Sequence, residues 1–435
     1  MSCRRVWGRW QAHWAHWLSR RMCCSVSPRK KIIHDGAPES NPGPLYLSGT
    51  NLARAGDHNQ RVTLHAVRLN GPVTRTDLTR KTGLTPAAIA NITNRLLKHQ
   101  LILNAGRLRG ARGQPASKFV INPDSRFSVG LNVDRDHVTL VVLDFVGKVR
   151  ARASREIHFA NPAAVRIFFQ RSIGQLLAKA GIARERLVGV GVAFPDDITR
   201  AHLPDQPADY AAWASVRIDD LIRDVLGIPV FIENDAAAAA IGEMQFGSGH
   251  RYRSFFYLLL TAALGGGVVA DGNYVRGAQG RSGEIGWLRA RNEAGEENQL
   301  QNIVSLSNLY SRLAERGFQV ATPRGLTRLN APARLIVARW IHESTEALVD
   351  AFLAINCLIN PEAILIGGRL PAPLVDQLAK SLNDRMGVHK AQFPAIAPVA
   401  RALTSDDAPA VGAAILPFSY RLLPTRFALL KTRDP

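Results

Sequence analysis

Apolar residues recur at two spacings along this chain, and the change of spacing separates two kinds of structure. In "HNQRVTLHAVRLNG", Val62, Leu64, Val67 and Leu69 follow helical spacing, and the pattern stops at Gly71-Pro72. Farther along, short apolar runs alternate with helical segments, which is the pattern of α/β proteins. We therefore expect a small helical module followed by a larger α/β body.

Two more helices follow the first one closely. Over "TRTDLTRKTG", Thr74 is a good N-cap, Asp77 is a capping-box partner three residues later, and Gly83 ends the helix. The next helix, in "LTPAAIANITNRLLKHQ", opens with Thr85 as N-cap and Pro86 at its first position. Two helices joined by a tight turn that contains glycine predict a helix-turn-helix.

The last of these helices has two different faces. Its buried stripe consists of Ile89, Ile92 and Leu96. Its opposite face is small or polar and consists of Ala87, Ala88, Asn91, Asn94 and Arg95. The small residues let the helix approach DNA closely, Asn91 could pair with an adenine edge, and Arg95 could reach guanine or phosphate. Taken alone, a three-helix pattern fits plain core packing equally well.

The segment after the helices has the features of a wing. "LILNAGRLRGARGQPASKFVI" predicts two short strands around a tip rich in glycine and arginine, which is placed to meet phosphates or enter a minor groove. The candidate DNA-binding residues are Thr74, Arg75, Thr85, Ala87, Ala88, Asn91, Asn94, Arg95, Arg107, Arg109 and Arg112.

The positive charge is concentrated in the same front part. The net charge is +20: residues 1–50 hold eight Lys/Arg and two Asp/Glu, residues 51–125 hold twelve and three, and the remaining 310 residues hold 35 and 30. A basic front before a near-neutral body is typical of a polyanion-binding module joined to another domain. A merely solvated basic surface is the alternative, but the helix-turn-helix and its basic wing favour DNA.

Composition excludes several other classes of protein. No apolar run approaches the ~18–20 residues needed to cross a bilayer. Three of the four cysteines lie near the N-terminus and Cys357 stands alone, so no disulfide framework is expected and the compartment should be the reducing cytoplasm. We expect no membrane contact.

The first 52 residues are assigned to a basic, tryptophan-rich, disordered extension and a linker. Trp10, Trp14 and Trp17 fall at helical spacing, which would also suit an amphipathic segment on a membrane surface. Translation from an upstream start, with Met22 as the true start, is a further alternative. "APESNPGP" (residues 37–44) is typical of a linker.

Strands are expected throughout the body. "FSVGLNVDRDHVTLVVLDFVGKVRARAS" predicts three strands, the second ending at Asp144, and "LVGVGVAFP", "GIPVFIEND" and "PEAILIGGRL" predict one each. "SFFYLLLTAALGGGVVADGNYVRG" predicts a strand, a glycine loop and a return strand. "DDAPAVGAAIL" opens a final helix.

The body resembles the ROK family, whose name stands for repressors, open reading frames and kinases. The resemblance rests on "GLNVDRDHVTLVVLDFVGKV", "PVFIENDAAAAAIGE", "LGGGVVADGNYVRGAQGRSGEIG", "NPEAILIGG" and "VGAA", in the family's order. It implies an actin-like, two-lobed sugar-kinase fold, and the winged helix in front points to the regulator branch. The implied domains are a winged helix-turn-helix at 53–123 and a sugar-kinase-like effector domain at 127–424. Lobe one spans about 127–235 plus 408–424, and lobe two about 236–407.

The resemblance implies roles for three residues in "FIEND" and "GEIG". In the family's kinases the Asp of the first motif, here Asp235, is the catalytic base. Asn234 before it and the Glu of the second motif, here Glu284, hydrogen-bond sugar hydroxyls. Their donors and acceptors suit vicinal hydroxyls. The alternative is that they merely cap the following helix.

The family's phosphate-binding segments are altered in this chain. In the first turn, Asp134, Arg135 and Asp136 stand where glycines and a threonine let backbone amides approach an anion, and two carboxylates there would repel ATP. The second loop reads Thr261-Ala262-Ala263 where Gly-Thr-Gly is usual. Because phosphoryl transfer depends on positioning and charge stabilisation, we expect no catalysis, with Asp235 only binding a ligand.

The family's zinc site is missing as well. Trp287 replaces the histidine after "GEIG", and no cysteine lies between Cys24 and Cys357, so we expect no metal and no cofactor. Trp287 could stack on a sugar face, or it could fill the pocket and leave a protein without effector. The ligand-binding candidates are Asn234, Asp235, Glu284 and Trp287.

Three functions remain to be compared. The first is a dimeric or larger ROK-type regulator, most simply a repressor of carbohydrate-utilisation genes, with operator DNA and a sugar or sugar derivative as partners. The second is an ATP-dependent sugar kinase with an added DNA-binding domain. The third is a scaffold that binds proteins. Intact phosphate loops would have favoured the second and a neutral recognition helix the third, so the first is favoured.

Overall fold

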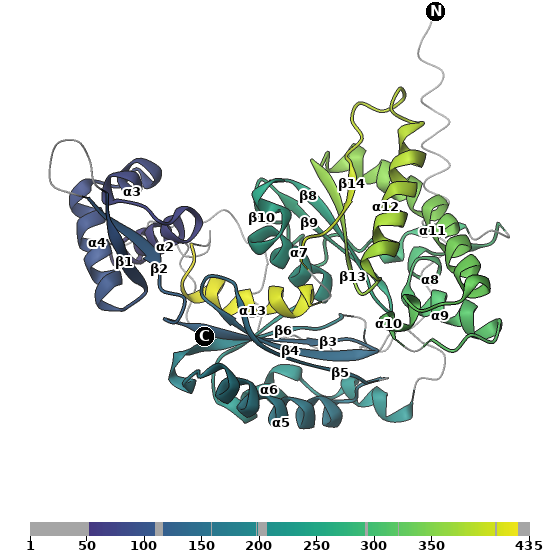
Figure 1. Cartoon of the computed structure of the whole chain (residues 1–435), viewed down its shortest axis with the longest axis horizontal. Coiled ribbons are helices and arrows are strands. Elements are labelled where there is room, and N and C mark those ends of the chain that lie inside the picture. Colours follow the sequence, from purple (N-terminus) through teal and green to yellow (C-terminus); the bar gives the residue numbers. More distant parts are fainter. Residues whose placement is uncertain are drawn as a thin grey trace, which may run out of the picture. The chain divides into compact units, whose positions relative to one another are not determined.

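The computed structural model of the chain describes residues 52–108, 116–157, 159–196, 198, 207–291, 295–320, 322–404 and 407–424. The expected extension therefore lies outside the described residues, apart from its last one. The first elements are three helices and a hairpin (Figure 1): α2 (Leu52–Asn70), α3 (Arg75–Thr82), α4 (Pro86–Lys98), and the antiparallel strands β1 (Ile102–Leu108) and β2 (Ala116–Ile121). This is the arrangement of a winged helix-turn-helix.

The predicted caps fix the two helices of the motif. Thr74 and Asp77 form the full capping box: the Thr74 hydroxyl accepts from the Asp77 N–H (3.2 Å), and the Asp77 carboxylate accepts from the Thr74 N–H (3.1 Å). Gly83 ends α3 at a φ of 71°, in the left-handed region that favours glycine. Thr85 caps α4 by accepting from the Ala88 N–H.

The three helices close around a small apolar core. Leu64, Val67, Leu78, Ile89 and Leu96 are buried together. In contrast, Leu69 is 50% exposed. Because residues of a helix turn by about 100° each, Leu69 lies about 200° around α2 from Val67 and faces away from this core.

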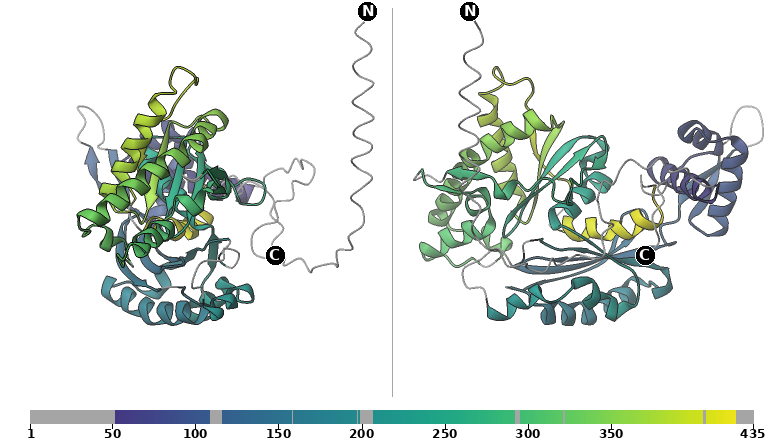
Figure 2. Two further views of the ribbon diagram at one scale, coloured as in Figure 1. Left: turned by 90° about the vertical axis from the view of Figure 1, so that its right-hand side faces the viewer. Right: turned by 180° about the vertical axis from the view of Figure 1, so that it is seen from behind.

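The body contains two five-stranded sheets. The first has the order β5-β4-β3-β6-β7, with β4 and β5 antiparallel and β6 and β7 parallel to their neighbours. Helices α5 and α6 cover its outer face (Figures 1 and 2). The bounds are β3 (Phe127–Val133), β4 (His137–Asp144), β5 (Val149–Glu156), α5 (Pro162–Ala180), η2 (Arg184–Arg186), β6 (Leu187–Ala193), η3 (Ala208–Ala214), α6 (Ile218–Leu226) and β7 (Val230–Glu233).

The second sheet has the order β10-β9-β8-β13-β14. Long helices pack on it around the buried Trp340 and Phe352. The bounds of its strands and nearby elements are η4 (Ser248–His250), β8 (Phe255–Leu260), β9 (Leu264–Ala270), β10 (Asn273–Tyr274), η5 (Ile285–Trp287), β11 (Arg289–Arg291), β12 (Glu297–Gln299), α8 (Leu300–Ile303), α9 (Leu306–Glu315), α10 (Pro323–Leu326), α11 (Ala331–Leu358), β13 (Ala363–Gly368), α12 (Ala372–Gly387) and β14 (Val399–Arg401).

Two helices connect the sheets. Helix α7 (Asp235–Phe246) packs on β9, and α13 (Ala408–Arg421) packs on β3, β6 and α7. Their contact is very close, because a Cβ atom on Gly412 would lie 1.7 Å from the carbonyl oxygen of Ala238. Two sheets with helices in this order form the actin-like, two-lobed fold that the sequence predicts.

One sequence expectation about the second sheet is wrong. The glycines after "TAAL" do not form a loop: Gly265, Gly266 and Gly267 lie inside β9, and the turn is formed by the preceding residues. A Cβ on Gly265 would lie 2.9 Å from the Cβ of Ala236, and one on Gly267 would lie 2.6 Å from that of Ala240. The glycines are needed because the alanine face of α7 rests directly on this strand.

No helix in the described part of the chain is long and apolar enough to span a lipid bilayer.

Candidate functional site

The structure has a polar pocket where the ends of β7, β8 and β9 meet the segment around residue 284. All four predicted ligand-binding residues line it. Its lining is Arg135, Pro195, Asp196, Asn234, Asp235, Ala236, Leu259, Thr261, Ala263, Leu264, Gly265, Gly266, Gly280, Arg281, Ser282, Glu284, Trp287 and Gln301. Segments far apart in the sequence thus form one site.

Asn234 and Asp235 enter the pocket from the junction of β7 and α7. The side-chain oxygen of Asn234 accepts hydrogen bonds from the N–H groups of Ala236 (2.9 Å) and Ala237 (3.2 Å). A carboxylate oxygen of Asp235 also accepts from the Ala236 N–H (2.8 Å). The helix-capping role is therefore real, and both side chains still line the pocket. Capping and ligand binding are compatible here, because each side chain has a second polar atom.

The residue before this pair has a structural role. Glu233 is 8% exposed and forms an ion pair with Arg276, which follows β10. The pair joins the first sheet to the second beside the pocket. It thereby fixes the end of β7 from which Asn234 and Asp235 project.

Glu284 reaches the pocket through a glycine contact. Gly283 has a φ of 83°, and a Cβ there would lie 2.7 Å from the carbonyl oxygen of Gly266. This close approach places Glu284 beside the start of β9. Arg281 donates to the Glu284 carboxylate (2.9 Å) and lies 4.0 Å from the carboxylate of Asp196. Two carboxylates of the pocket thus lie beside a guanidinium that no sequence motif indicates.

Trp287 lies at the pocket with 40% of its surface exposed, so its indole does not fill the cavity as a core residue would. Gln301 from α8 lines the same region, and its amide donates to Gln299 (2.9 Å). An indole face beside carboxylate and amide groups is a combination that suits a ring bearing several hydroxyls.

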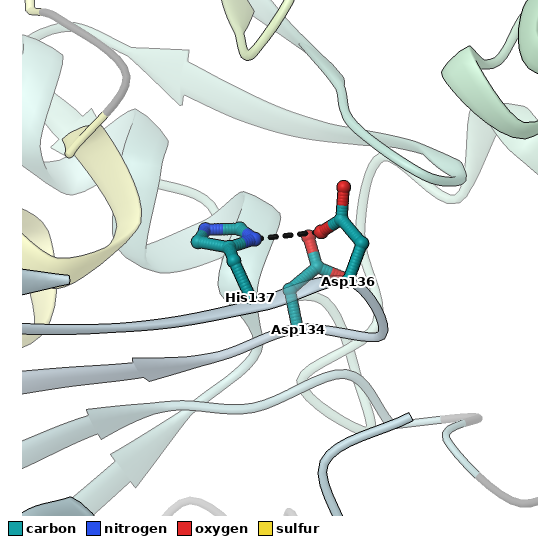
Figure 3. Close-up of side chains that lie close together, drawn as sticks. All are labelled: Asp134, Asp136 and His137. Atoms are coloured by element: carbon teal, nitrogen blue, oxygen red, sulfur yellow. Dashed lines mark hydrogen bonds and ion pairs between the residues drawn. The ribbon is translucent and has the colours of Figure 1, made fainter. Parts of the chain in front are cut away.

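A second cluster occupies the turn between β3 and β4 (Figure 3). Ligand atoms of Asp134, Asp136 and His137 lie within 4.8 Å of one another, a spacing that could hold a metal ion. However, the His137 Nδ1 is already hydrogen-bonded to the Asp136 carboxylate (2.7 Å), and the other ring nitrogen is 3.1 Å from the Asn132 amide. The other Asp136 oxygen accepts from Arg369 (2.7 Å). The positive group beside these carboxylates is therefore a guanidinium of the chain itself.

Arg369 changes the interpretation of this turn. It follows β13 in the second sheet and pairs with both Asp136 and Glu156 of the first sheet. Burial alone would raise the pKa of Asp136, but the hydrogen bond and charge of His137 and the charge of Arg369 hold it below its usual range. The expectation that two carboxylates repel ATP at this turn must therefore be corrected, since Arg369 compensates the charge of Asp136. An ion-paired contact between the lobes occupies this turn.

The second altered loop is tightly bonded within the protein. Thr261 is 3% exposed, and its N–H donates to the Ala263 carbonyl (3.0 Å). The Thr261 carbonyl accepts from the Leu306 N–H (2.9 Å), and the Ala262 carbonyl accepts from the Ser307 hydroxyl (2.7 Å). The Thr261 amide is therefore engaged inside the turn.

The candidate DNA-binding face is largely exposed. Ala87, Asn91, Asn94 and Arg95 are exposed on α4, and Ala88 is half-buried. Exposed Arg75 on α3 donates to Asn94 (2.7 Å) and to Thr93 (2.9 Å), which ties the two helices together on this side.

The contacts of Thr74, Arg95 and the wing arginines differ from one another. Thr74 is buried and acts as a cap, so its side chain does not reach outward. Arg95 donates to the side chain of Gln60 on α2. Arg107 belongs to β1, where it is paired with Ser117, whereas Arg109 and Arg112 lie outside the described residues.

Comparison with known proteins identifies the family. The profile of the ROK family matches residues 128–418, more than half of the chain. The chain belongs to the ROK family.

Individual relatives and a solved structure agree with this assignment. The chain is 26% identical over 233 residues to the xylose repressor of Bacillus subtilis (strain 168), covering 53% of this chain and 60% of that protein. It is 25% identical over 316 residues to the DNA-binding transcriptional repressor Mlc of Escherichia coli (strain K12), covering 69% and 78%. A solved ROK family transcriptional regulator, described as a homolog of E. coli MLC, superposes with a TM-score of 0.64 at 21% identity and covers 87% of this chain and 100% of its own. The fold of this chain is thus that of a ROK regulator.

Proposed function

We propose that this chain is a ROK-family transcriptional repressor that binds operator DNA in the cytoplasm and responds to a sugar or sugar derivative. The carrying observation is the exposed polar face of α4, with Asn91, Asn94 and Arg95, in a winged helix-turn-helix joined to a ROK body. Such a helix can enter a major groove and present amide and guanidinium groups to base edges. The repressors to which the chain is similar support the same function.

The pocket supports a polyhydroxylated effector. Asp235 and Glu284 accept hydrogen bonds, the amide nitrogens of Asn234 and Gln301 donate them, and Trp287 offers a flat apolar face. Vicinal hydroxyls of a sugar need this mixture of donors and acceptors.

Phosphoryl transfer is not part of the proposal. The base position, Asp235, is retained, which is the specific observation in favour of an ATP-dependent sugar kinase. Against it, Arg369 pairs with Asp136 and Glu156 at the first phosphate turn, and Thr261 is buried in the second loop. A base without a held phosphoryl donor cannot complete the transfer.

A dimer or larger oligomer is also proposed. A single winged helix contacts too little DNA for high specificity, whereas two copies can bind two half-sites of a palindrome.

The function is tested by selecting DNA from a random pool with the full-length protein and titrating the selected and random sequences by gel shift. Tight binding of the selected DNA that weakens with D-xylose, D-glucose or N-acetyl-D-glucosamine supports a sugar-responsive repressor. Sugar-dependent ADP release without specific DNA binding would instead establish the kinase.

A further inference from the structure

Helix α7 has one end in the pocket and the other end against the DNA-binding domain. It begins at Asp235, directly after its N-cap Asn234, and its last residues are Gln245 and Phe246. Arg68, on the first helix of the winged domain, donates to the Gln245 side chain, and its guanidinium carbon lies 5.4 Å from the centre of the Phe246 ring. The two functional regions are therefore one helix of 12 residues apart, about 18 Å.

The middle of α7 is tightly packed on several sides, so we expect the helix to move as one rigid unit. Every residue from Ala236 to Glu243 is buried. Gly242 faces Gly412 of α13, and strand β9 presents glycines to the alanines on the other side. Because close-packed protein interiors have low compressibility, a displacement at one end of the helix is transmitted to the other end rather than absorbed.

The far end of α7 is also joined to α13. The buried Glu243 accepts from the N–H groups of Leu403 (2.9 Å) and Thr404 (2.8 Å), in the segment that leads into α13. At the other end of α13, the Tyr420 carbonyl accepts from Arg61 of α2 (2.9 Å). The two helices thus both contact α2, at Arg68 and at Arg61.

On the α2 side, the contact leads into the core of the winged domain. Leu64 and Val67 lie on the same helix as Arg61 and Arg68 and pack with Ile89 of α4. A shift of α2 therefore changes the placement of α4, which carries the candidate recognition residues.

We infer that α7 couples the pocket to the DNA-binding domain: a ligand at Asn234 and Asp235 shifts α7, and Gln245 and Phe246 pass the shift to Arg68. The inference rests on the proposed function and names its regulation. By thermodynamic linkage, operator DNA must change the affinity of the pocket for its ligand by the same factor by which the ligand changes operator affinity. Factors of ~5–150-fold are typical.

The test compares the wild type with Arg68→Met, which keeps an apolar stem but loses the guanidinium, and with Gln245→Ala. Arg385→Met is the matched control, since Arg385 pairs with Glu346 between α12 and α11, and thermal melting checks that each variant folds. The first readout is hydrogen exchange of residues 235–240 with and without the DNA selected from the random pool, which needs no knowledge of the sugar. We expect DNA to change exchange at these residues in the wild type and the control, and to change it much less in both variants.

The second readout is the ratio of operator dissociation constants with and without D-xylose, D-glucose or N-acetyl-D-glucosamine, using whichever shifts the melting temperature. This ratio should fall by about threefold or more in Arg68→Met, within the typical coupling range, while sugar affinity measured without DNA stays within about twofold. DNA binding without any exchange change in the wild type, or an unchanged response in both folded variants, would overturn the coupling alone. Absence of specific DNA binding would overturn the proposed function itself.

Discussion

Arg369 and Asp136 lie 233 residues apart in the sequence and form an ion pair of 2.7 Å between the two lobes. Arg369 comes from the carboxyl end of β13, and Asp136 from the turn between β3 and β4. The family's kinases bind nucleotide phosphates near that turn. In this chain, an ion pair within the protein joins the two lobes at that turn.

Loss of this ion pair should destabilise the protein. Arg369→Met leaves the Asp136 carboxylate partly buried beside His137, and we expect about 2–3 kcal/mol less stability, below the full cost of a completely buried pair because Asp136 is 18% exposed. The double variant Arg369→Met/Asp136→Leu should recover much of this loss. Denaturant titration measures both changes; a single variant as stable as the wild type would show that the pair contributes nothing.

Stability should also depend on pH through His65 on α2. Burial, and then the charge of Arg68, lower the pKa of His65 from 6.5 to about 4. Because the unfolded chain then takes up this proton at a higher pH than the folded protein, the free energy of unfolding falls as the pH drops from about 6.5 to about 4, by at most ~1.4 kcal/mol per pH unit. His65→Gln should flatten this slope, while the exposed His99→Gln should not. Equal slopes in all three proteins would exclude His65 as the source.

Alanine substitutions on the exposed face of α4 should reduce the discrimination between DNA sequences. Asn91→Ala should weaken binding to the selected DNA by ~1–3 kcal/mol and change binding to random DNA little, because a base contact carries sequence information and a phosphate contact does not. Arg95→Ala should act similarly and also remove the bond to Gln60. Gel-shift titration on both DNAs separates these outcomes. If Asn91→Ala weakens both equally, this residue does not read bases.

The wing arginines should behave differently. Arg109→Ala and Arg112→Ala are expected to weaken binding evenly across sequences and to reduce its salt dependence, as the loss of phosphate contacts does. Titrations at several salt concentrations measure the slope. A variant that changes sequence preference while keeping the wild-type salt slope would contradict a phosphate role.

Asp235→Asn should reduce the response to the effector sugar and leave operator affinity without sugar unchanged. The substitution removes an acceptor from the pocket, whereas the candidate DNA-binding residues lie in another domain. The wild type with ATP, magnesium and hexoses, pentoses or amino sugars should release no ADP above background. Sugar-dependent ADP release that disappears in Asp235→Asn would establish a kinase.

Light scattering should find a dimer or larger oligomer at micromolar concentration. Two recognition helices about one DNA turn apart, ~34–36 Å, would then face successive major grooves. A monomer both with and without the selected DNA would contradict this assembly.

Local signals were sufficient for the helix-turn-helix. Its helix caps and its turn depend on contacts between residues only three or four positions apart, which involve Thr74, Asp77, Gly83 and Thr85. They could therefore be predicted from the sequence, and the hydrogen bonds confirm them. The family resemblance predicts the pocket residues Asn234, Asp235 and Glu284, and the structure brings them together.

Long-range relationships could not be predicted in this way. Nothing near Arg369 in the sequence indicates that it pairs with Asp136, and Gln301 and Arg281 reach the pocket only through the packing of separate segments. Glycine is common in loops, so the sequence pattern predicts a loop at the glycines that in fact lie in β9. Their actual cause, the close approach of Ala236 and Ala240, depends on tertiary structure.

The helix-capping hydrogen bonds of Asn234 affect how the pocket should discriminate between sugar analogues. Since the side-chain oxygen accepts from Ala236 and Ala237, the orientation of the amide is set and its nitrogen is the atom left to meet a ligand. A hydroxyl at Asn234 must therefore serve as an acceptor, whereas one at the Asp235 carboxylate must serve as a donor. Fluorine accepts weakly and never donates. A sugar fluorinated at the carbon that faces Asn234 should keep part of its affinity, and one fluorinated at the carbon that faces Asp235 should lose it, so a set of monofluorinated sugars would reveal the orientation of the ring in the pocket.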